Sequence, residues 1–419
     1  MTQFENKEVV LDTNILMGAK KASHLIDTFQ EARQISVTLG TVRELDRLKM
    51  AEGKKGFEAR SALRMLREYE DIFNIVDTDN SEMPSVDPKT VDGDIITYAT
   101  FSNQSDHKSV VVTNDLSMST ISKANRVETV QYNEPSDSFR PGFTIVEIGE
   151  MLREKNITQI LDEYKDQIKV NEYFIGLEFE FPKYYYRRTT VEGAFERLSR
   201  DYVIKSQQLG NYKPKGGDAA QYLAFDMLGQ HDISLLTGPA GSGKTLLCLA
   251  KQFEMLEQGV IDKITVFVNP EKARGAKTLG FYKGDRNLKL MQESIGGILA
   301  TKLGGGQEDV LQLIESGKIE VIPISDIRGY EVNKNSSLFI TEAQNLTKDL
   351  MQLALQRAGE GVKIFIEGDP NTQLDSWMYE GDNNGMLRMI EVFTGSSTFG
   401  NIALQSIYRS PVAELAKLM

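Results

Sequence analysis

Cysteine and histidine are scarce in this chain, and their scarcity limits what it can bind. The 419 residues include one cysteine, Cys248, and three histidines. A single cysteine cannot form an intramolecular disulfide, and no Cys/His spacing typical of a zinc site occurs. Any metal bound here is therefore expected to be a hard cation held by oxygen atoms.

Long apolar runs are also missing. No stretch approaches the roughly 20 apolar residues that a membrane-spanning helix needs. The opening MTQFENKEVV lacks the basic-then-apolar layout of a signal peptide. These features predict a cytoplasmic protein with no membrane partner.

Positive charge is in deficit, with 48 Lys and Arg against 60 Asp and Glu and a net charge of −12. Affinity for phosphates over a whole surface comes from Lys and Arg. Indiscriminate nucleic-acid binding is therefore not expected, although a basic channel is compatible with this charge. The excess of carboxylates suits a protein that holds divalent cations.

Short apolar segments typical of strands alternate with helix-like segments in two blocks. The first block, residues 7–132, has the strand-like segments KEVVLD, ISVTL, DIFNIVD, KSVVVTND and VETVQY. Its helix-like segments lie around 14–32, 41–50, 57–70, 92–102 and 116–124. The second block begins near residue 218 and has the strand-like segments DISLLTG, KITVFVN, IEVIPI, SLFIT and VKIFIEGD. Such alternation predicts parallel sheets covered by helices on both faces.

The predicted fold class is therefore α/β, and the length of the chain suggests two or three domains. We expect two three-layer α/β/α domains, residues 1–135 and 215–419, joined by a small, partly β connector at 136–214. Within the connector, residues 183–188 (KYYYRR) combine aromatic rings with cations. That composition is typical of a single-strand nucleic-acid contact or, more often, of a hydrophobic core.

A phosphate-binding loop follows the first strand of the second block. GPAGSGKT matches G-x-x-x-x-G-K-[ST] between a strand and a helix. The predicted nucleotide-binding residues are Gly238, Pro239, Ala240, Gly241, Ser242, Gly243, Lys244 and Thr245. Backbone N–H groups wrap the phosphates, Lys244 reaches the β- and γ-phosphates, and Thr245 can bind Mg²⁺.

Other polar residues follow the strands of this block. The strand within SSLFITEAQNLT, residues 336–347, delivers Thr341 and Glu342, where nucleotide-hydrolysing sheets usually carry Asp then Glu. Gln373 follows the next strand, at the sheet edge where ligands bind. Arg409 could contact a γ-phosphate in its own or a neighbouring subunit, and Gln221 could read an adenine edge. Taken singly, Asp369 and Asp375 beside Gln373 could be turn residues next to Pro370, Arg409 a surface charge and Gln221 part of a solvated helix face.

These motifs resemble the PhoH family of P-loop ATPases, which is related to superfamily 1 helicases. The resemblance covers residues ~215–419 through GPAGSGKT, LGFYKGD, EAQNLT, RAGEGVKIFIEGD and YRSPVAELA. It implies ATP hydrolysis, with Glu342 polarising the attacking water, Gln373 sensing the γ-phosphate and Arg409 acting as an arginine finger. It also implies a ring-shaped homo-oligomer, a hexamer, with ATP at the subunit boundaries.

Three departures from the family pattern stand out. Thr341 replaces the Asp before Glu-Ala-Gln, Asn269 replaces an Arg, and the spacing from Gly368 to Gln373 is one residue longer than usual. A Thr hydroxyl can accept a hydrogen bond from Mg²⁺-bound water but brings no charge. We therefore expect slowed hydrolysis with a raised Mg²⁺ requirement, and a gain of turnover at low Mg²⁺ in Thr341→Asp.

Acidic residues in the first block follow a similar logic. They lie at strand ends or helix starts, which can meet at the carboxyl edge of one parallel sheet: Asp12, Glu44, Asp92, Asp94 and Asp115. Clustered carboxylates repel one another unless a cation neutralises them, which predicts bound Mg²⁺ or Mn²⁺. Individually, Asp12 and Asp92 could also be helix N-caps and Glu44 a solvated side chain.

As a set, these acids resemble the PIN nuclease domain over residues ~6–133, with Asn14 beside Asp12 and Thr113 beside Asp115. The resemblance implies metal-dependent endoribonuclease activity on single-stranded RNA. Asp92 is preferred to Asp94 as the third acid because of its spacing to Ile95. A PIN domain followed by a PhoH domain is a known fusion linked to RNA unwinding and cleavage.

The sequence thus predicts an ATP-driven RNA-processing enzyme with two sites. Two alternatives remain open: an ATP-binding RNA clamp with little hydrolysis because of Thr341, and a DNA-directed motor.

Overall fold

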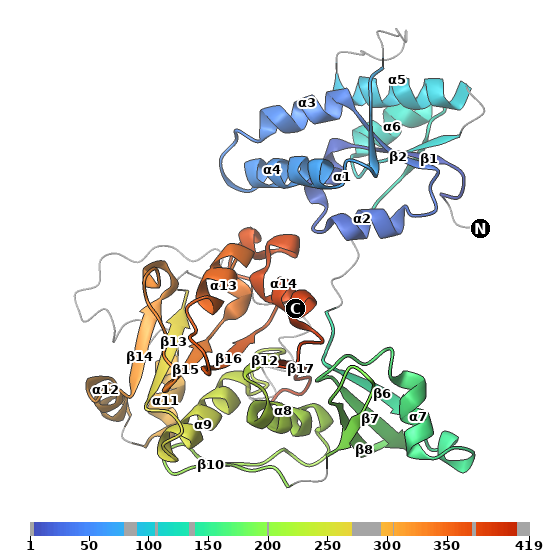
Figure 1. Cartoon of the computed structure of the whole chain (residues 1–419). Helices are drawn as coiled ribbons and strands as arrows, with labels where there is room; N and C mark the ends of the chain where they lie inside the picture. The colour runs from blue at the N-terminus through green and yellow to red at the C-terminus, as the bar shows by residue number, and fades with distance from the viewer. Residues whose placement is uncertain are drawn as a thin grey trace. The chain divides into compact units, whose positions relative to one another are not determined.

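The computed structural model describes residues 4–78, 90–104, 108–133, 139–198, 201–269, 295–304, 306–370 and 374–408. They fall into two compact units, residues 1–137 and 138–419 (Figure 1). Within these ranges, no helix combines the length and apolar character required to cross a membrane.

The first unit is built on a five-stranded parallel sheet in the order β3-β2-β1-β4-β5. Its strands are β1 (Glu8–Leu11), β2 (Gln34–Thr38), β3 (Phe73–Val76), β4 (Ser109–Val112) and β5 (Glu128–Val130). Its helices are α1 (Thr13–Gly18), α2 (Ala22–Thr28), α3 (Leu39–Leu48), α4 (Gly53–Glu68), α5 (Val91–Gln104) and α6 (Leu116–Ala124).

Both faces of this sheet are buried, which explains its short apolar strands. Along β1, Val9 and Leu11 pack into one cluster, and Val10 packs into a second cluster with Ile95 and Ile96 of α5. A sheet covered on both faces needs apolar side chains on alternate sides of each strand. The predicted three-layer α/β arrangement is confirmed for this unit.

The helix expected around residues 14–32 is instead two helices. α1 ends at Gly18, and Ala19 and Lys21 adopt extended backbone angles before α2 begins. Apolar periodicity continues across the break through Leu16 and Leu25, which share one cluster. The prediction of one helix therefore missed the change of direction between α1 and α2.

The second unit contains a six-stranded parallel sheet in the order β14-β13-β15-β16-β12-β17. Its strands are β12 (Ile233–Thr237), β13 (Lys263–Val268), β14 (Ile319–Pro323), β15 (Ser336–Ile340), β16 (Lys363–Gly368) and β17 (Phe399–Ala403). Its α-helices are α8 (Ala219–Gln230), α9 (Lys244–Glu257), α11 (Gly297–Lys302), α12 (Gln307–Glu315), α13 (Lys348–Leu355) and α14 (Gly385–Phe393). The short 3-10 turns are η3 (Ile324–Asp326), η4 (Ala343–Asn345), η5 (Trp377–Tyr379) and η6 (Gly381–Asn383).

Helices cover both faces of this sheet as well. Figure 1 shows α8 and α9 on one side and α13 and α14 on the other. On β15, Phe339 packs toward the α8 and α9 side, whereas Leu338 and Ile340 pack toward α13 and α14. The α/β expectation is therefore confirmed for this unit too.

One strand of this sheet was not expected from the sequence. β17 lies parallel to the P-loop strand β12, with Ile233 opposite Phe399. Its sequence, FGNIA, includes Gly400, where an added Cβ would lie 2.4 Å from the His231 ring. Because that close approach requires glycine, the strand lacks the usual β-branched signal.

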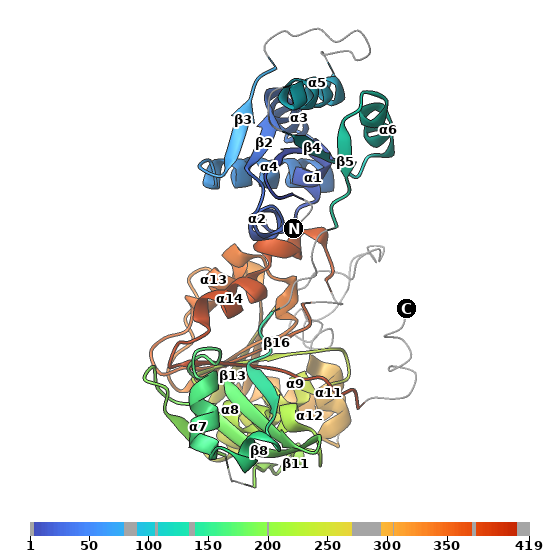
Figure 2. The ribbon, with the colours of Figure 1, turned by 90° about the vertical axis from the view of Figure 1, so that its right-hand side faces the viewer.

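The connector belongs to the second unit and carries its own small sheets. A four-stranded sheet has the order β6-β7-β8-β9, and β10 and β11 form an antiparallel pair. The elements are β6 (Phe143–Glu147), η1 (Met151–Arg153), α7 (Ile157–Tyr164), β7 (Tyr173–Glu178), β8 (Phe181–Arg188), β9 (Phe195–Arg197), β10 (Ile204–Ser206) and β11 (Gly210–Tyr212). α7 covers one face of the four-stranded sheet, and α8 packs against the other (Figures 1 and 2).

Direct hydrogen bonds tie the connector to the edge strand β17. The Asn171 side chain donates to three carbonyls, those of Ser396 at 3.0 Å, Ser397 at 2.9 Å and Phe399 at 3.2 Å. Asn401 of β17 donates in return to the carbonyl of Arg140 at 2.7 Å. The connector therefore packs as part of the second unit.

The aromatic and basic segment 183–188 serves the core. Tyr186 is buried beside α7, and Arg187 binds Asp226 and Glu196. Arg188 is buried and donates to the carbonyls of Lys165 and Ile168. These cations are used internally, so the structure favours the core over the single-strand contact.

Candidate nucleotide and metal sites

The phosphate-binding loop joins β12 to α9 and depends on its glycines. Gly238 has φ +137° and Gly243, at the N-cap of α9, has φ +93°. A Cβ on Gly238 would lie 2.3 Å from the carbonyl oxygen of Leu404, which follows β17. The loop conformation is therefore accessible only to glycine at these positions.

Lys244 lies folded along the loop. Its ammonium donates to the carbonyls of Gly238 at 2.7 Å and Pro239 at 3.1 Å. Within the described part of the chain, the buried hydroxyls of Ser242 and Thr237 have no hydrogen-bond partner. A buried cation and buried hydroxyls beside a helix N-terminus are suited to an anionic ligand, so the residues present fit a nucleotide phosphate.

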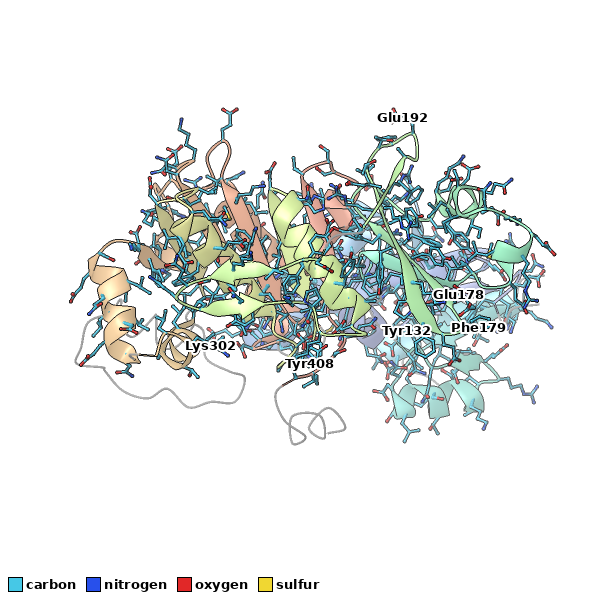
Figure 3. The ribbon with its side chains drawn as sticks, turned by 90° about the horizontal axis from the view of Figure 1, so that it is seen from below. Tyr132, Glu178, Phe179, Glu192, Lys302 and Tyr408 are labelled. Atoms are coloured by element: carbon cyan, nitrogen blue, oxygen red, sulfur yellow. The ribbon has the colours of Figure 1, made fainter. Side chains whose placement is uncertain are left out.

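Gln221 lies beside the loop, among residues that gather near Gly241. Its side-chain oxygen accepts from the Lys215 N–H at 2.6 Å, and Asp218 caps the same helix. The Tyr408 hydroxyl donates to Asp218, and its N–H donates to the Gly241 carbonyl at 2.9 Å (Tyr408 is labelled in Figure 3). The Lys215 ammonium lies 3.7 Å from the Tyr408 ring centroid. The side-chain oxygen of Gln221 is thus already used within the fold, and its contact with an adenine edge stays a prediction.

Thr341 directly follows β15 and lies beside a buried carboxylate that the sequence interpretation missed. The Thr341 hydroxyl donates to Oε1 of Glu367 at 2.6 Å, and the Glu342 N–H donates to the same oxygen at 3.1 Å. Glu367, on β16, is 1% exposed. Burial raises its pKa, as does the Glu342 carboxylate, while the Lys244 ammonium lowers the pKa. A signal was present, because Glu367 interrupts the apolar strand KIFIEG.

Glu342 has a strained backbone and an exposed side chain. Its φ of 50° and ψ of 42° are left-handed, which is costly for a residue other than glycine. The side chain accepts from Gln344 at 2.6 Å, and the oxygen of Gln344 accepts from the Asp369 N–H at 3.1 Å. Such strain is often found at functional positions, and here it places a carboxylate at the end of β15.

Asn269, at the end of β13, is used in a polar network. Its amide donates to the Asn345 carbonyl at 2.6 Å and to the Tyr379 hydroxyl at 3.2 Å. Asn345 in turn donates to Asp375 at 2.5 Å. Three other predictions lie outside the described residues: Gln373, Arg409 and the LGFYKGD segment 279–285.

In the first unit, Asp12 and Asp115 follow the neighbouring strands β1 and β4. Oδ2 of Asp12 accepts from Asn14 at 2.5 Å and from the Thr113 hydroxyl at 2.6 Å. Oδ1 of Asp115 caps α6 by accepting from the Ser117 N–H at 2.6 Å. Asp12 occupies the N-cap position of α1, but its side chain makes no capping hydrogen bond.

Electrostatics connect four of the five predicted acids. Burial raises the pKa of Asp12, and the charges of Asp92 and Asp115 raise this pKa further. Burial also raises the pKa of Asp92, followed by the charges of Asp115 and Glu44. Glu44 accepts from the Thr13 hydroxyl at 2.7 Å, which turns it toward α1. Mutual repulsion of this kind is what a bound cation would relieve.

Asp94 is engaged elsewhere. It is buried and accepts from the Gly40 N–H at 2.9 Å and from the Thr78 hydroxyl at 2.5 Å. A Cβ on Gly40 would lie 2.4 Å from the Asp94 carboxylate, so the two residues are in tight contact. This carboxylate joins the start of α3 to the segment after β3.

The carboxylate oxygens of these acids are suitable ligands for a hard cation, but the carboxylates are not close enough together to coordinate one. Among the described residues, no three His, Cys, Asp or Glu side chains are close enough to form a metal-binding group as they stand. A divalent cation would have to draw the side chains of Asp12, Asp92 and Asp115 inward. Their chemistry therefore fits Mg²⁺ or Mn²⁺, with adjustment of side chains on binding.

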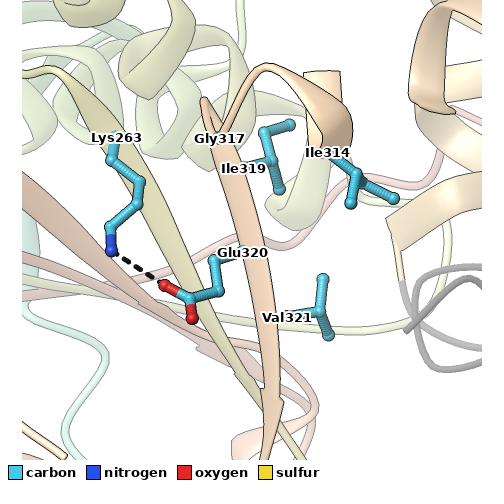
Figure 4. A pocket seen from close by; sticks show the side chains of 6 residues that line it. All are labelled: Lys263, Ile314, Gly317, Ile319, Glu320 and Val321. Carbon is cyan, nitrogen blue, oxygen red and sulfur yellow. Dashed lines mark hydrogen bonds and ion pairs between the residues drawn. The ribbon is translucent and has the colours of Figure 1, made fainter. Parts of the chain in front are cut away.

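A pocket of about 360 Å³ lies elsewhere, at the edge of the sheet formed by β14 (Figure 4). Its lining residues are Lys263, Ile314, Gly317, Ile319, Glu320 and Val321. Lys263 and Glu320 form an ion pair of 2.8 Å there. None of the predicted site residues lines this pocket.

The two units thus define two classes of domain: a parallel α/β domain with strand-end carboxylates, and a P-loop nucleotide-binding domain. A family model described as PIN domain matches residues 9–133, and one described as PhoH-like protein matches residues 213–419. The chain belongs to the PIN–PhoH family, in which a domain of a nuclease family precedes a domain of a P-loop ATPase family.

Relatives match over part of their length. Protein PhoH2 of Bacillus subtilis (strain 168) is 34% identical over 222 residues, which cover 51% of this chain and 49% of that protein. Protein PhoH2 of Mycolicibacterium smegmatis is 31% identical over 209 residues, covering 49% of this chain and 47% of that protein. The chain therefore spans about half the length of these curated relatives.

Solved structures are similar at a lower level. The PIN domain endonuclease Utp24 is 16% identical, with a TM-score of 0.21, covering 30% of this chain and 86% of that chain. Pif1 helicase from Candida albicans is 13% identical, with a TM-score of 0.22, covering 45% of this chain and 39% of that chain. Scores this low carry no conclusion about function.

Proposed function

We propose that this protein is an ATP-dependent RNA-processing enzyme. The observation that carries the proposal is the meeting, in one parallel sheet, of the loop bearing Lys244 with the strand end bearing Glu342. Lys244 would exchange its loop carbonyls for phosphate oxygens, and Thr245 would bind Mg²⁺. Glu342 would orient the attacking water on the γ-phosphate, with Gln373 and Arg409 contacting the same phosphate.

The first unit would cleave single-stranded RNA. Asp12, Glu44, Asp92 and Asp115 would together hold Mg²⁺ or Mn²⁺, which supplies an activated water and stabilises the leaving oxygen. Asn14 and Thr113 hold the Asp12 carboxylate in place. Asp94 has a positioning role in this proposal, because its oxygens bind Gly40 and Thr78.

ATP hydrolysis would drive translocation or unwinding of RNA. The proposed assembly is a cytoplasmic homo-hexameric ring in which Arg409 acts within its own subunit or on a neighbouring one. RNA would pass from the ATPase units to the nuclease units, so that each nucleotide cycle presents new single strand for cleavage.

The test is steady-state ATP hydrolysis across a Mg²⁺ titration, with and without single-stranded RNA and with a matched DNA strand. Turnover stimulated by RNA supports the proposal, and stimulation by DNA alone would instead indicate a DNA-directed motor. Thr341 favours a second candidate, an ATP-binding RNA clamp. Bound ATP that is not split even at high Mg²⁺ would establish the clamp and overturn the motor.

A further inference from the structure

Residue 367 lies between the two strand ends that surround the phosphates. β16 pairs with β15 on one side, with Ile340 opposite Ile366, and with β12 on the other, with Leu236 opposite Glu367. Thr341 follows Ile340 directly, and the P-loop begins after Thr237. Glu367 is therefore placed between the start of the phosphate-binding loop and the position where an Asp was expected.

The hydrogen bonds orient this carboxylate and leave one of its oxygens available. Both donors, the Thr341 hydroxyl at 2.6 Å and the Glu342 N–H at 3.1 Å, end on Oε1. Within the described residues, Oε2 of Glu367 receives no hydrogen bond from the protein. Thr341 therefore donates a hydrogen bond to the Glu367 carboxylate. It occupies the position where an Asp was expected but carries no carboxylate itself.

Burial makes a purely structural role for this charge expensive. Glu367 is 1% exposed, and among the described residues no Lys or Arg lies within ion-pair distance of it, although the charge of the Lys244 ammonium lowers its pKa. A buried carboxylate is costly when ionised, so it either holds a proton, as the raised pKa of Glu367 indicates for the cation-free state, or is compensated by a cation. A hydrogen-bonded link between β15 and β16 alone would be made equally well by Gln, without the charge.

We propose that Glu367 supplies the carboxylate for the nucleotide's Mg²⁺ that Thr341 cannot supply. The carboxylate comes from the neighbouring strand β16, and its Oε2 accepts a hydrogen bond from cation-bound water while Thr245 binds the ion directly. Glu367 is a positioning residue for the cation in this account. The inference rests on the proposed binding of ATP and Mg²⁺ by the second unit.

The test measures cation affinity directly. Mn²⁺ is titrated into the full chain with a non-hydrolysable ATP analogue, and free Mn²⁺ is followed by electron paramagnetic resonance. Loss of an outer partner of a bound metal typically costs about 10–100-fold in affinity. We expect Glu367→Gln to weaken Mn²⁺ binding by that factor, with unchanged binding of the analogue in EDTA.

Glu320→Gln is the matched control, because it makes the same replacement on β14, in the pocket of Figure 4. It should leave Mn²⁺ affinity as in the unsubstituted chain. The double variant Thr341→Asp/Glu367→Thr places the carboxylate at residue 341, directly after β15, and should bind Mn²⁺ at least ten-fold more tightly than Glu367→Gln.

Two results overturn the inference: Mn²⁺ affinity in Glu367→Gln equal to that of the unsubstituted chain, or a double variant as weak as Glu367→Gln. If Glu367→Gln does not fold, the double variant decides alone, since it should then bind Mn²⁺ like the unsubstituted chain. A different failure, in which the unsubstituted chain binds no nucleotide-dependent Mn²⁺, would reject the proposed function itself.

Discussion

Individual carboxylates in this chain are distinguished by what their oxygens already bind. Asp92 and Asp94 lie two residues apart at the start of α5, and spacing alone left both as candidates. Asp94 accepts two hydrogen bonds from the fold, whereas burial and the charges of Asp115 and Glu44 raise the pKa of Asp92. We therefore propose Asp92 as the metal ligand and a structural role for Asp94.

Substitution of these two residues should have opposite effects. A raised carboxyl pKa means that folding disfavours the ionised form, so the neutral amide in Asp92→Asn should raise the metal-free melting temperature. The same variant should lose at least about 100-fold in Mn²⁺-dependent RNA cleavage, since it removes a proposed ligand. Thermal unfolding in EDTA and cleavage of a short single-stranded RNA measure the two effects.

Asp94→Asn is the matched comparison at the same helix end. It weakens the hydrogen bonds to Gly40 and Thr78 and should cost about 1–2 kcal/mol of stability, with cleavage within a few-fold of the unsubstituted chain. Loss of cleavage in Asp94→Asn and retention in Asp92→Asn would reverse the assignment.

Helices and strands of the second unit are joined at their ends by hydrogen bonds and close packing, as at the junction between α8 and β12. His231 caps α8 just before β12 and packs against Gly400 of β17. Lys363 at the start of β16 donates to its carbonyl at 3.3 Å. This corner therefore joins one helix to three adjacent strands through a single residue, His231, whose imidazole is buried.

The corner should make the second unit sensitive to acid. Burial, with the nearby charges of Arg187 and Lys363, lowers the pKa of His231 from 6.5 to about 4. Since the unfolded chain then takes up the proton first, stability is complete above pH 6.5 and falls as the pH drops toward 4. From these two values, about 2 kcal/mol should be lost by pH 5.

Urea unfolding at pH 7 and at pH 5 measures this loss of stability. Unfolding is monitored by the fluorescence of Trp377, the one tryptophan of the chain, which lies in the second unit. His231→Gln should reduce the loss by about 2 kcal/mol. His24→Gln, in the first unit, should leave it unchanged. An equal loss in His231→Gln and the unsubstituted chain would show that other groups carry the acid sensitivity.

At the scale of the whole molecule, each unit has its own sheet and its own hydrophobic clusters. Described residues of the first unit form two clusters around its five strands, and those of the second form three around its sheets. Each candidate site lies within one unit. The two proposed activities should therefore be separable by single substitutions.

We expect Asp12→Asn to abolish RNA cleavage while ATP hydrolysis stays within two-fold. Glu342→Gln should reduce ATP turnover by at least about 100-fold, because it removes the group that orients water, and should spare metal-dependent cleavage of a short single strand. Both activities are measured on the same preparations of full-length chain. Normal ATP turnover in Glu342→Gln, or full cleavage in Asp12→Asn, would remove that residue from its proposed role.

The sequence predicted most of the fold because its signals are local. Strands such as those around Val9–Leu11 and Leu338–Ile340 are buried on both faces, so each appears in the sequence as a continuous apolar run. The P-loop is identified by its glycines. β17 was missed because Gly400 carries no side chain to signal a strand. The break between α1 and α2 was missed because apolar periodicity continues through it.

By itself, the sequence determined the two α/β units, the phosphate-binding loop and the set of acids at strand ends, because residue type and spacing along the chain define them. Only the tertiary structure decided which partners each charged side chain contacts. Asp94 accepts a hydrogen bond from Gly40, and Arg187 forms a buried ion pair with Asp226. Glu367 contacts Thr341, which lies 26 residues earlier in the chain. Those pairings arise from strand order and side-chain burial, which bring together residues that no local pattern connects.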